Sequence, residues 1–436
     1  MIGIFNGDND PRYNRAQATP VPHPDNHIAA CYFPGAGLGG TFLEYLFNGA
    51  TASDIDEDCI RVYRYIVQHY TPGHEVWMFG LSRGAYTVRC VAGIINNCGI
   101  LKRRDNNGNA VLTNNNDNLT VQEEALCDEV YRIYRSEDPE DSPKGSRSNA
   151  FRAQHSHSVA TPVKFMGLFD TVGSLGIPYL NPGIGLDFRE FYDTKVSSVV
   201  EKVYHALSMH DRLWGFEPCH ALPDHDRIGP QFEIHERWFP GCHYDLGRQR
   251  FRFLRYGSDR FESVIGDILG PLSNIIEPNQ VFADLVLKWM LERIQSHDPL
   301  GTVIPNINNE INRSIRDMEN AAPAYTGSGD IYNNLLAFGP AGRLWELLAS
   351  VFPVGLFRDF PDITAAFNAL TQTRDRIISD PTGELTLYDQ PCPQLENRRV
   401  GDLGRIGPTV PQRYPSRTYE VFIAAGNIPA AGSSPC

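Results

Sequence analysis

A five-residue segment, Gly-Leu-Ser-Arg-Gly at 80–84, constrains the fold of this chain more than any other feature. It follows a short apolar run at 76–79, and apolar residues over 85–95 then recur with the spacing of a buried helix. A Gly-x-Ser-x-Gly segment between a strand and a helix is typical of a sharp, strained turn that presents a serine nucleophile. Its two glycines are expected to avoid Cβ atoms that would collide where strand and helix converge. The segment predicts Ser82 as a nucleophile, with an ordinary tight turn as the alternative.

The composition narrows the class of protein. A hydrophobic fraction of 42% in 436 residues is ordinary for a globular protein with a buried core. A net charge of −13 argues against a nucleic-acid-binding surface and against a polybasic patch for anionic lipid. The first residues lack the basic and apolar regions of a signal peptide, and no window holds about twenty apolar residues. We therefore expect a soluble, cytoplasmic protein without a transmembrane segment.

The cysteines and histidines do not predict a metal site. Nine cysteines are scattered without a Cys-x-x-Cys pair, so we expect mostly buried free thiols. The histidines His205, His210, His220 and His225 lack a spacing typical of metal ligands. Neither a metal nor an organic cofactor is predicted.

The order of the apolar runs predicts a parallel sheet. A helix is expected over 55–70, a strand over 76–79 and a second helix after Ser82, which is the alternation of a βαβ unit. Further core strands are expected at 2–5, 28–33, 163–169 and 232–239, with a helix or strand at 202–209 and a clear helix at 281–291. The predicted fold class is α/β, with an α/β-hydrolase core whose mostly parallel sheet is flanked by helices.

Polar and helical segments predict how the chain is divided. Residues 1–250 are expected to form the catalytic core, with a polar insertion at about 102–160 that is rich in Asn, Asp and Ser. Residues 251–436 are expected to form a helical cap packed on the core. Within this cap, 335–357 combines many apolar residues with few charges. That pattern fits a lid over an acyl pocket, a contact with a lipid surface or a core helix.

Two residues downstream of Ser82 can complete the chemistry of a serine nucleophile. A serine needs a histidine to take its proton, and the histidine needs a carboxylate to hold its tautomer. In α/β hydrolases these partners follow in the order serine, acid, histidine. Asp170 directly follows one expected core strand, and His243 lies in a loop after another. They are the predicted acid and base, with Asp245 and Asp211 as alternative acids and a turn-forming role as the simpler reading of Asp170.

Backbone N–H groups are expected to stabilise the oxyanion that forms when an ester is attacked. The N–H of Arg83, directly after the nucleophile, is the expected first donor. The N–H of Gly7 or Asp8, after the first expected strand, is the candidate for the second. The Arg83 side chain itself also fits a solvated or structural arginine.

Four sequence blocks within residues 1–250 resemble the DUF2235 family. They lie at 80–85, 167–174, 205–208 with Arg212, and 236–247. This α/β-hydrolase family includes the phospholipase effectors of type VI secretion systems. The resemblance implies an ester hydrolase with Ser82 as nucleophile, His243 as base and Asp170 as acid. The opening segment is similar to the family's Phe-Asp-Gly-Thr motif, with Asn6 in place of the aspartate and Asp8 in place of the threonine.

The predicted function is hydrolysis of a carboxylic ester, with a lipid or another hydrophobic ester as substrate, through a Ser-His-Asp triad and an acyl-enzyme. A transient contact with a lipid surface fits this function, nucleic acid is not an expected partner, and the sequence predicts no oligomeric state. Two alternatives stay open. One is an enzyme of the same fold that acts as a thioesterase, lactonase or non-hydrolytic tailoring enzyme. The other is a non-catalytic binding protein that retains the fold.

Overall fold

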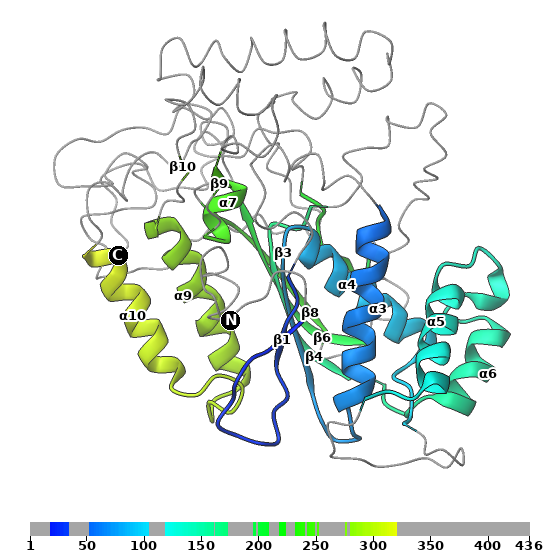
Figure 1. Cartoon of the computed structure of the whole chain (residues 1–436). Coiled ribbons are helices and arrows are strands. Elements are labelled where there is room, and N and C mark those ends of the chain that lie inside the picture. The colour runs from blue at the N-terminus through cyan, green and yellow to red at the C-terminus, as the bar shows by residue number, and fades with distance from the viewer. Residues whose placement is uncertain are drawn as a thin grey trace, which may run out of the picture.

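A parallel sheet of four strands forms the centre of the structure, which is a computed structural model of the chain (Figure 1). The strands lie in the order β3-β4-β6-β8, and every neighbouring pair is parallel. Their bounds are Val76–Leu81 for β3, Val163–Phe169 for β4, Val200–Ser208 for β6 and Glu233–Phe239 for β8. The structure describes residues 18–34, 52–103, 118–160, 162–172, 195–197, 199–208, 218–223, 232–239, 242–248, 251–252, 275–276 and 280–320.

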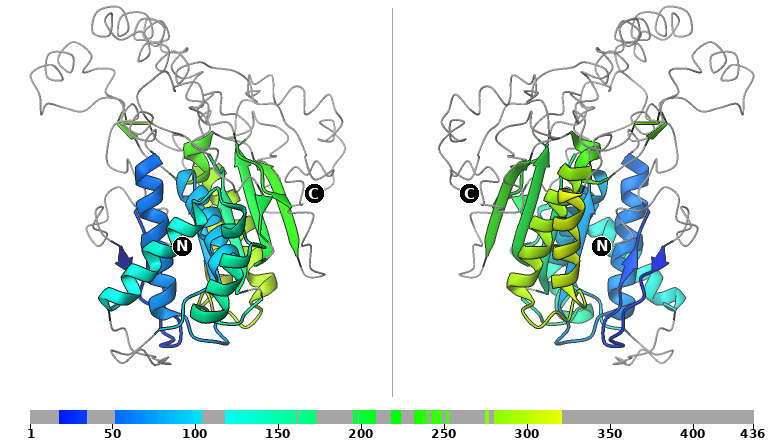
Figure 2. Two further views of the ribbon diagram at one scale, coloured as in Figure 1. Left: turned by 90° about the vertical axis from the view of Figure 1, so that its right-hand side faces the viewer. Right: turned by 90° about the vertical axis from the view of Figure 1, so that its left-hand side faces the viewer.

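Helices cover both faces of this sheet (Figure 2). Helix α4 lies against one face, and α3, α5 and α6 pack against α4. Helix α9 lies against the other face, and α10 packs against α9. Their bounds are Ala52–His69 for α3, Arg83–Cys98 for α4, Val121–Tyr134 for α5, Ser146–His155 for α6, Gln280–His297 for α9 and Ile307–Glu319 for α10.

The side chains of β4 explain why the sheet has a core on each face. The strand is an almost uninterrupted apolar run that is buried along its length, as expected for a strand covered on both sides. Met166 and Leu168 belong to the core on the α4 side, whereas Phe165 and Phe169 belong to the core on the α9 side. This alternation follows from the two-residue period of a strand.

Short elements complete the described fold. They are η1 (Pro139–Asp141), α7 (His243–Leu246) and three two-residue strand pairs, namely β1 (Thr19–Pro20) with β2 (Cys31–Tyr32), β5 (Lys195–Val196) with β7 (Leu222–Pro223), and β9 (Phe251–Arg252) with β10 (Ile275–Ile276). The prediction of a core strand at 28–33 is wrong, because only β2 forms there and it pairs antiparallel with β1 outside the four-stranded sheet. Prolines at 20, 22 and 24 of the partner segment lack the N–H groups that a longer ladder needs. The expected strand at 2–5 lies outside the described residues.

The α/β class is confirmed by the observed elements. The expected strands at 163–169 and 232–239 and the expected helices at 55–70 and 281–291 are all present, and 202–209 is a strand, β6. Within the described ranges, no helix has both the length and the apolar character needed to cross a membrane.

The parallel order of the strands gathers several polar residues at one end of the sheet. Ser82 directly follows β3, Asp170 directly follows β4, and Ser208 is the last residue of β6. Helix α7, which begins at His243, follows β8 at the same end (Figure 1). The carboxyl ends of the strands therefore hold the residues that the sequence singles out.

Candidate active site

Ser82 lies on a strained turn between β3 and α4. Its backbone has φ 59° and ψ −123°, and a positive φ is unfavourable for a residue with a Cβ atom. The Ser82 N–H donates to the Phe169 carbonyl oxygen at 2.9 Å, and the Ser82 carbonyl oxygen accepts from the Ala85 N–H at 3.1 Å. The turn is therefore held both by the neighbouring strand and by the first turn of α4.

The two glycines that flank Ser82 are not equivalent. A Cβ atom at Gly80 would lie 2.3 Å from the Gly84 carbonyl oxygen, so β3 and α4 can approach this closely only with glycine at that position. A Cβ atom at Gly84 would meet nothing within 4 Å. The expectation of a collision is right for Gly80 and wrong for Gly84, because a side chain at that position of α4 would not face β3.

Asp170 and His243 meet in a fully buried contact. His243 Nδ1 lies 2.7 Å from Asp170 Oδ2, and both residues are 0% exposed. The backbone N–H of Ser208 donates to Asp170 Oδ1 at 2.8 Å, and the Ser208 hydroxyl donates to Oδ2 at 2.8 Å. Three donors converge on one carboxylate, which favours its ionised form. The structure thus brings together the predicted acid and the predicted base.

This contact fixes the tautomer of His243. An ionised carboxylate can only accept hydrogen bonds, so the proton of a neutral imidazole lies on Nδ1 and the lone pair on Nε2. Such an imidazole is ready to accept a proton at Nε2, and the buried carboxylate would stabilise the imidazolium that results. A neutral imidazole in this tautomer has the free lone pair that a general base requires.

Asp245, one alternative acid, caps the start of helix α7. Its Oδ2 accepts from the Cys242 N–H at 2.7 Å, and its own N–H donates to the Cys242 carbonyl oxygen at 2.9 Å. These two bonds cap the first turn of α7, where N–H groups have no partner within the helix. Asp245 therefore holds the helix that carries His243. The other alternative, Asp211, lies outside the described residues.

The predicted oxyanion donors are only partly described. Arg83 is the first residue of α4, so its N–H belongs to the positive end of the helix dipole, next to Ser82. Gly7 and Asp8 lie outside the described residues. The first predicted donor is therefore at the carboxyl end of the sheet, and the second stays a prediction.

A second polar cluster, formed by Thr171, His205, Glu236 and His220, follows Asp170 on the sheet face covered by α4. The N–H of Thr171 donates to His205 Nε2 at 3.1 Å, and His205 Nδ1 lies 2.7 Å from Glu236 Oε1. Glu236 Oε2 lies 2.7 Å from His220 Nδ1. Burial lowers the pKa of His205, in spite of the opposing effect of Glu236, with Arg89 and His220 also lowering it. Burial alone would raise the pKa of Glu236, but hydrogen bonds from the two histidines hold it well below its ordinary value.

Sequence reasoning assigned no role to Ser208, Thr171 or Glu236. All three lie within the blocks that carry the family resemblance, at 167–174, 205–208 and 236–247. Position in the blocks is the only signal that could have singled them out, because their contacts depend on which residues face each other across neighbouring strands.

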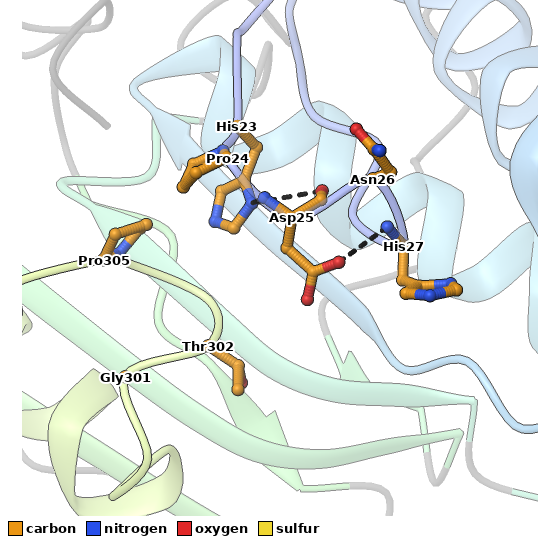
Figure 3. A pocket seen from close by; sticks show the side chains of 8 residues that line it. All are labelled: His23, Pro24, Asp25, Asn26, His27, Gly301, Thr302 and Pro305. Atoms are coloured by element: carbon orange, nitrogen blue, oxygen red, sulfur yellow. Dashed lines mark hydrogen bonds between the residues drawn. The ribbon is translucent and has the colours of Figure 1, made fainter.

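An open cavity of about 570 Å³ lies between the β1–β2 connection and the α9–α10 connection (Figure 3). His23 Nδ1 accepts from the Asp25 N–H at 3.0 Å, and Asp25 Oδ1 accepts from the His27 N–H at 2.8 Å, so these polar groups stabilise the loop itself. Across the described part of the chain, no group of three or more His, Cys, Asp or Glu residues could hold a metal ion. Both connections that line the cavity lie at the end of the sheet away from α7 (Figure 1), so the cavity is separate from the candidate site.

Comparisons with known proteins give one family match and one distant relative. The family model described as "T6SS, Phospholipase effector Tle1-like, catalytic domain" matches residues 15–293, which is more than half of the chain. The chain is also 26% identical over 218 residues to an uncharacterized protein of Saccharomyces cerevisiae, YEL023C. That alignment covers 46% of this chain and 28% of the yeast protein, so it spans less than a third of the relative's length. No solved structure matches the chain significantly.

Proposed function

Because this chain belongs to the family of Tle1-like phospholipase effectors of type VI secretion, we propose that it is a serine hydrolase that cleaves a carboxylic ester of a phospholipid. The observation that carries the proposal is the buried 2.7 Å contact between Asp170 and His243 at the carboxyl end of the sheet. The strained turn at Ser82 supports it, since β3 and β4 are neighbours and Ser82 and Asp170 follow them directly.

The proposed reaction has two steps through one acyl-enzyme. Ser82 Oγ attacks the ester carbonyl carbon while His243 Nε2 takes the hydroxyl proton, and the proton then passes to the leaving alcohol oxygen. In the second step His243 takes a proton from water, the resulting hydroxide attacks the acyl-enzyme, and Ser82 leaves with the proton returned to it. Asp170 holds the imidazole and stabilises its charged form in both steps. The N–H of Arg83, with that of Gly7 or Asp8, would bind the oxyanion.

The proposal includes an α/β-hydrolase fold. It is supported by parallel strands in which a strained serine turn and an aspartate follow neighbouring strands and a histidine comes later in the chain. We propose residues 1–250 as the catalytic core and 251–436 as a C-terminal region packed on it. Helix α9 of that region lies against the second face of the sheet. The proposed lid or lipid-contact segment, 335–357, lies outside the described residues.

The test compares the wild-type chain with Ser82→Ala on two substrates. Phosphatidylcholine vesicles report phospholipid cleavage through released fatty acid, and p-nitrophenyl butyrate reports ester cleavage without a lipid surface. We expect both activities in the wild type and a loss of about 10⁴-fold or more in kcat in the variant, as expected when a nucleophile is removed. Equal activity in both proteins, or none in either, would contradict the proposal. Cleavage of the short ester alone would retain the hydrolase and reject the phospholipid.

A further inference from the structure

The turn after β4 has backbone groups that must be satisfied without water. Asp170 has φ 42°, and both Asp170 and Thr171 are 0% exposed. A buried N–H group without a partner is costly, and a positive φ adds strain for a residue with a Cβ atom. The Thr171 N–H donates to His205 Nε2 at 3.1 Å, and the Thr171 carbonyl oxygen accepts from the Cys219 N–H at 2.7 Å. The imidazole of His205 therefore helps to hold the backbone directly after Asp170.

His205 can accept the hydrogen bond from the Thr171 N–H in one protonation state only. Its Nε2 must carry a lone pair to accept the Thr171 N–H, so its single proton lies on Nδ1. Glu236 Oε1, at 2.7 Å from Nδ1, accepts that proton's hydrogen bond and selects this tautomer. The Thr171 Oγ1 also lies 3.0 Å from His205 Nε2. In an imidazolium, or in the other tautomer, an Nε2–H could donate to that hydroxyl oxygen, but it would face the Thr171 N–H and the backbone bond would be lost. The neutral state matches the full burial of His205.

Glu236 is in turn fixed from the other side. Its Oε1 also accepts from the Ala221 N–H at 2.7 Å, and its Oε2 lies 2.7 Å from His220 Nδ1. Arg89 of α4 donates to the carbonyl oxygens of Cys219 and His220, at 2.7 and 3.0 Å. The segment 218–223 is thus tied both to the helix that follows the nucleophile and to the turn that carries the acid.

We propose that His205 and Glu236 are positioning residues that hold the Asp170–Thr171 turn so that the Asp170 carboxylate meets His243 Nδ1. This inference rests on the proposed hydrolase function. Neither residue touches the reacting atoms. Glu236 sets the tautomer of His205, His205 anchors the Thr171 N–H, and the anchored turn keeps the carboxylate aligned. A displacement of about 1 Å in such a group can lower turnover by about 100-fold.

Strands β6 and β8 contain a second pair of facing polar residues, which provides a control for the effect of Glu236. Lys202 of β6 faces Glu233 of β8 in register, as His205 faces Glu236. Lys202 Nζ lies 2.7 Å from Glu233 Oε1, near the amino ends of the strands and away from the turn. Glu233→Gln and Glu236→Gln therefore remove a carboxylate from the same strand pair, but only Glu236 leads to Asp170.

The experiment measures kcat, KM and thermal unfolding for four variants on p-nitrophenyl butyrate, with Ser82→Ala as reference. His205→Leu removes the acceptor and should lower kcat by about 10- to 100-fold, with little change in KM because substrate binding is untouched. Glu236→Gln should lower kcat less, since an amide can accept from one histidine but lets His205 adopt either tautomer. His205→Gln offers an amide oxygen to the Thr171 N–H and should recover most of the loss. Glu233→Gln should leave kcat within about twofold of wild type.

The outcomes separate the two claims. If hydrolysis does not depend on Ser82, the proposed function fails and the positioning role fails with it. If hydrolysis depends on Ser82 but folded Glu236→Gln and His205→Leu proteins keep wild-type kcat, only the positioning role is overturned. A loss of stability with unchanged kcat also overturns it, because it marks the pair as merely structural. Should His205→Leu not fold, Glu236→Gln compared with Glu233→Gln decides the question.

Discussion

The two ends of the central sheet differ in how far their charged side chains are exposed to solvent. At the amino ends, Lys164 pairs with Glu201 at 2.8 Å and Lys202 pairs with Glu233 at 2.7 Å. Each side chain in these pairs keeps some exposure to solvent, from 11% for Lys202 to 46% for Glu233. Such pairs lie where water compensates for most of the cost of charge.

At the carboxyl ends, the polar groups are shut away from solvent. Asp170, His205 and His243 are each 0% exposed, and each has polar partners at hydrogen-bonding distance. Burying a charge is costly unless hydrogen bonds and opposite charges replace water. The cost of burying charge is therefore concentrated at the carboxyl ends, where we propose the active site.

The largest expected effect comes from changing the buried acid. Asp170→Asn keeps the shape of the side chain but can donate to His243 Nδ1, which would favour the wrong tautomer. We expect kcat on a short-chain ester to fall by about 10⁴-fold. A variant that folds and keeps wild-type turnover would move the acid elsewhere. Asp245→Asn is the matched control, since Asp245 caps α7, and it should cost far less activity.

The close approach of β3 and α4 should make a single added methyl group at Gly80 strongly destabilising. Gly80→Ala places a Cβ atom 2.3 Å from the Gly84 carbonyl oxygen, so β3 or α4 must shift. We expect the free energy of unfolding, measured by urea denaturation, to fall by about 1–3 kcal/mol or more, with loss of activity. Gly84→Ala has room and lies in a helix, where alanine is favoured over glycine by up to about 1 kcal/mol. Equal destabilisation by both changes would contradict this difference.

The pH dependence of stability should also distinguish the two ends. Burial lowers the pKa of His205 below that of an unfolded chain, about 6.5, so below this pH the unfolded chain binds more protons. The free energy of unfolding should therefore be highest above about pH 6.5 and fall as the pH drops through that value towards the lower folded-state pKa. His297, near the amino ends, is only half-buried, and burial lowers its pKa in the same direction. The urea midpoint of unfolding should be measured for each protein at several pH values. Its dependence on pH should be reduced more by His205→Gln than by His297→Gln. A larger reduction in His297→Gln would contradict the predicted difference between the two ends of the sheet.

The smallest effect is expected at the amino ends. Glu201→Gln breaks the pair with Lys164 but leaves both groups some access to water. The free energy of unfolding should fall by about 1 kcal/mol or less, and kcat should not change. A large loss of activity in Glu201→Gln would contradict this expectation, because it would show that charges at the amino ends affect turnover at the candidate active site.

Much of the sheet could be predicted from sequence because its strands are buried on both faces. β4 is an apolar run, and β8 was placed within a residue of its observed start. The sequence allows either a helix or a strand for β6, because Lys202 and His205 interrupt its apolar pattern and their acidic partners lie on β8. The prediction of a core strand at 28–33 is wrong because an isolated apolar run does not show that its partner segment carries prolines at 20, 22 and 24, which limit the ladder to two residues.

The candidate site was predictable to the extent that it follows strand ends. Ser82, Asp170 and His243 each come after a recognisable strand, and parallel strands bring such positions to one edge. The sequence favours Asp170 as the acid and keeps Asp245 as an alternative, because only the structure shows that the Asp245 carboxylate accepts from the Cys242 N–H. The His205–Glu236 contact was missed because it depends on the register of two strands.

The most direct test of the account is to treat the folded wild-type chain with a serine-reactive fluorophosphonate and locate the adduct by mass spectrometry. We expect a single adduct on Ser82, with labelling much slower in Asp170→Asn because His243 would no longer be held as a base. An adduct on another serine, or no adduct under conditions where the chain hydrolyses an ester, would contradict the assignment of Ser82, His243 and Asp170 as one catalytic unit.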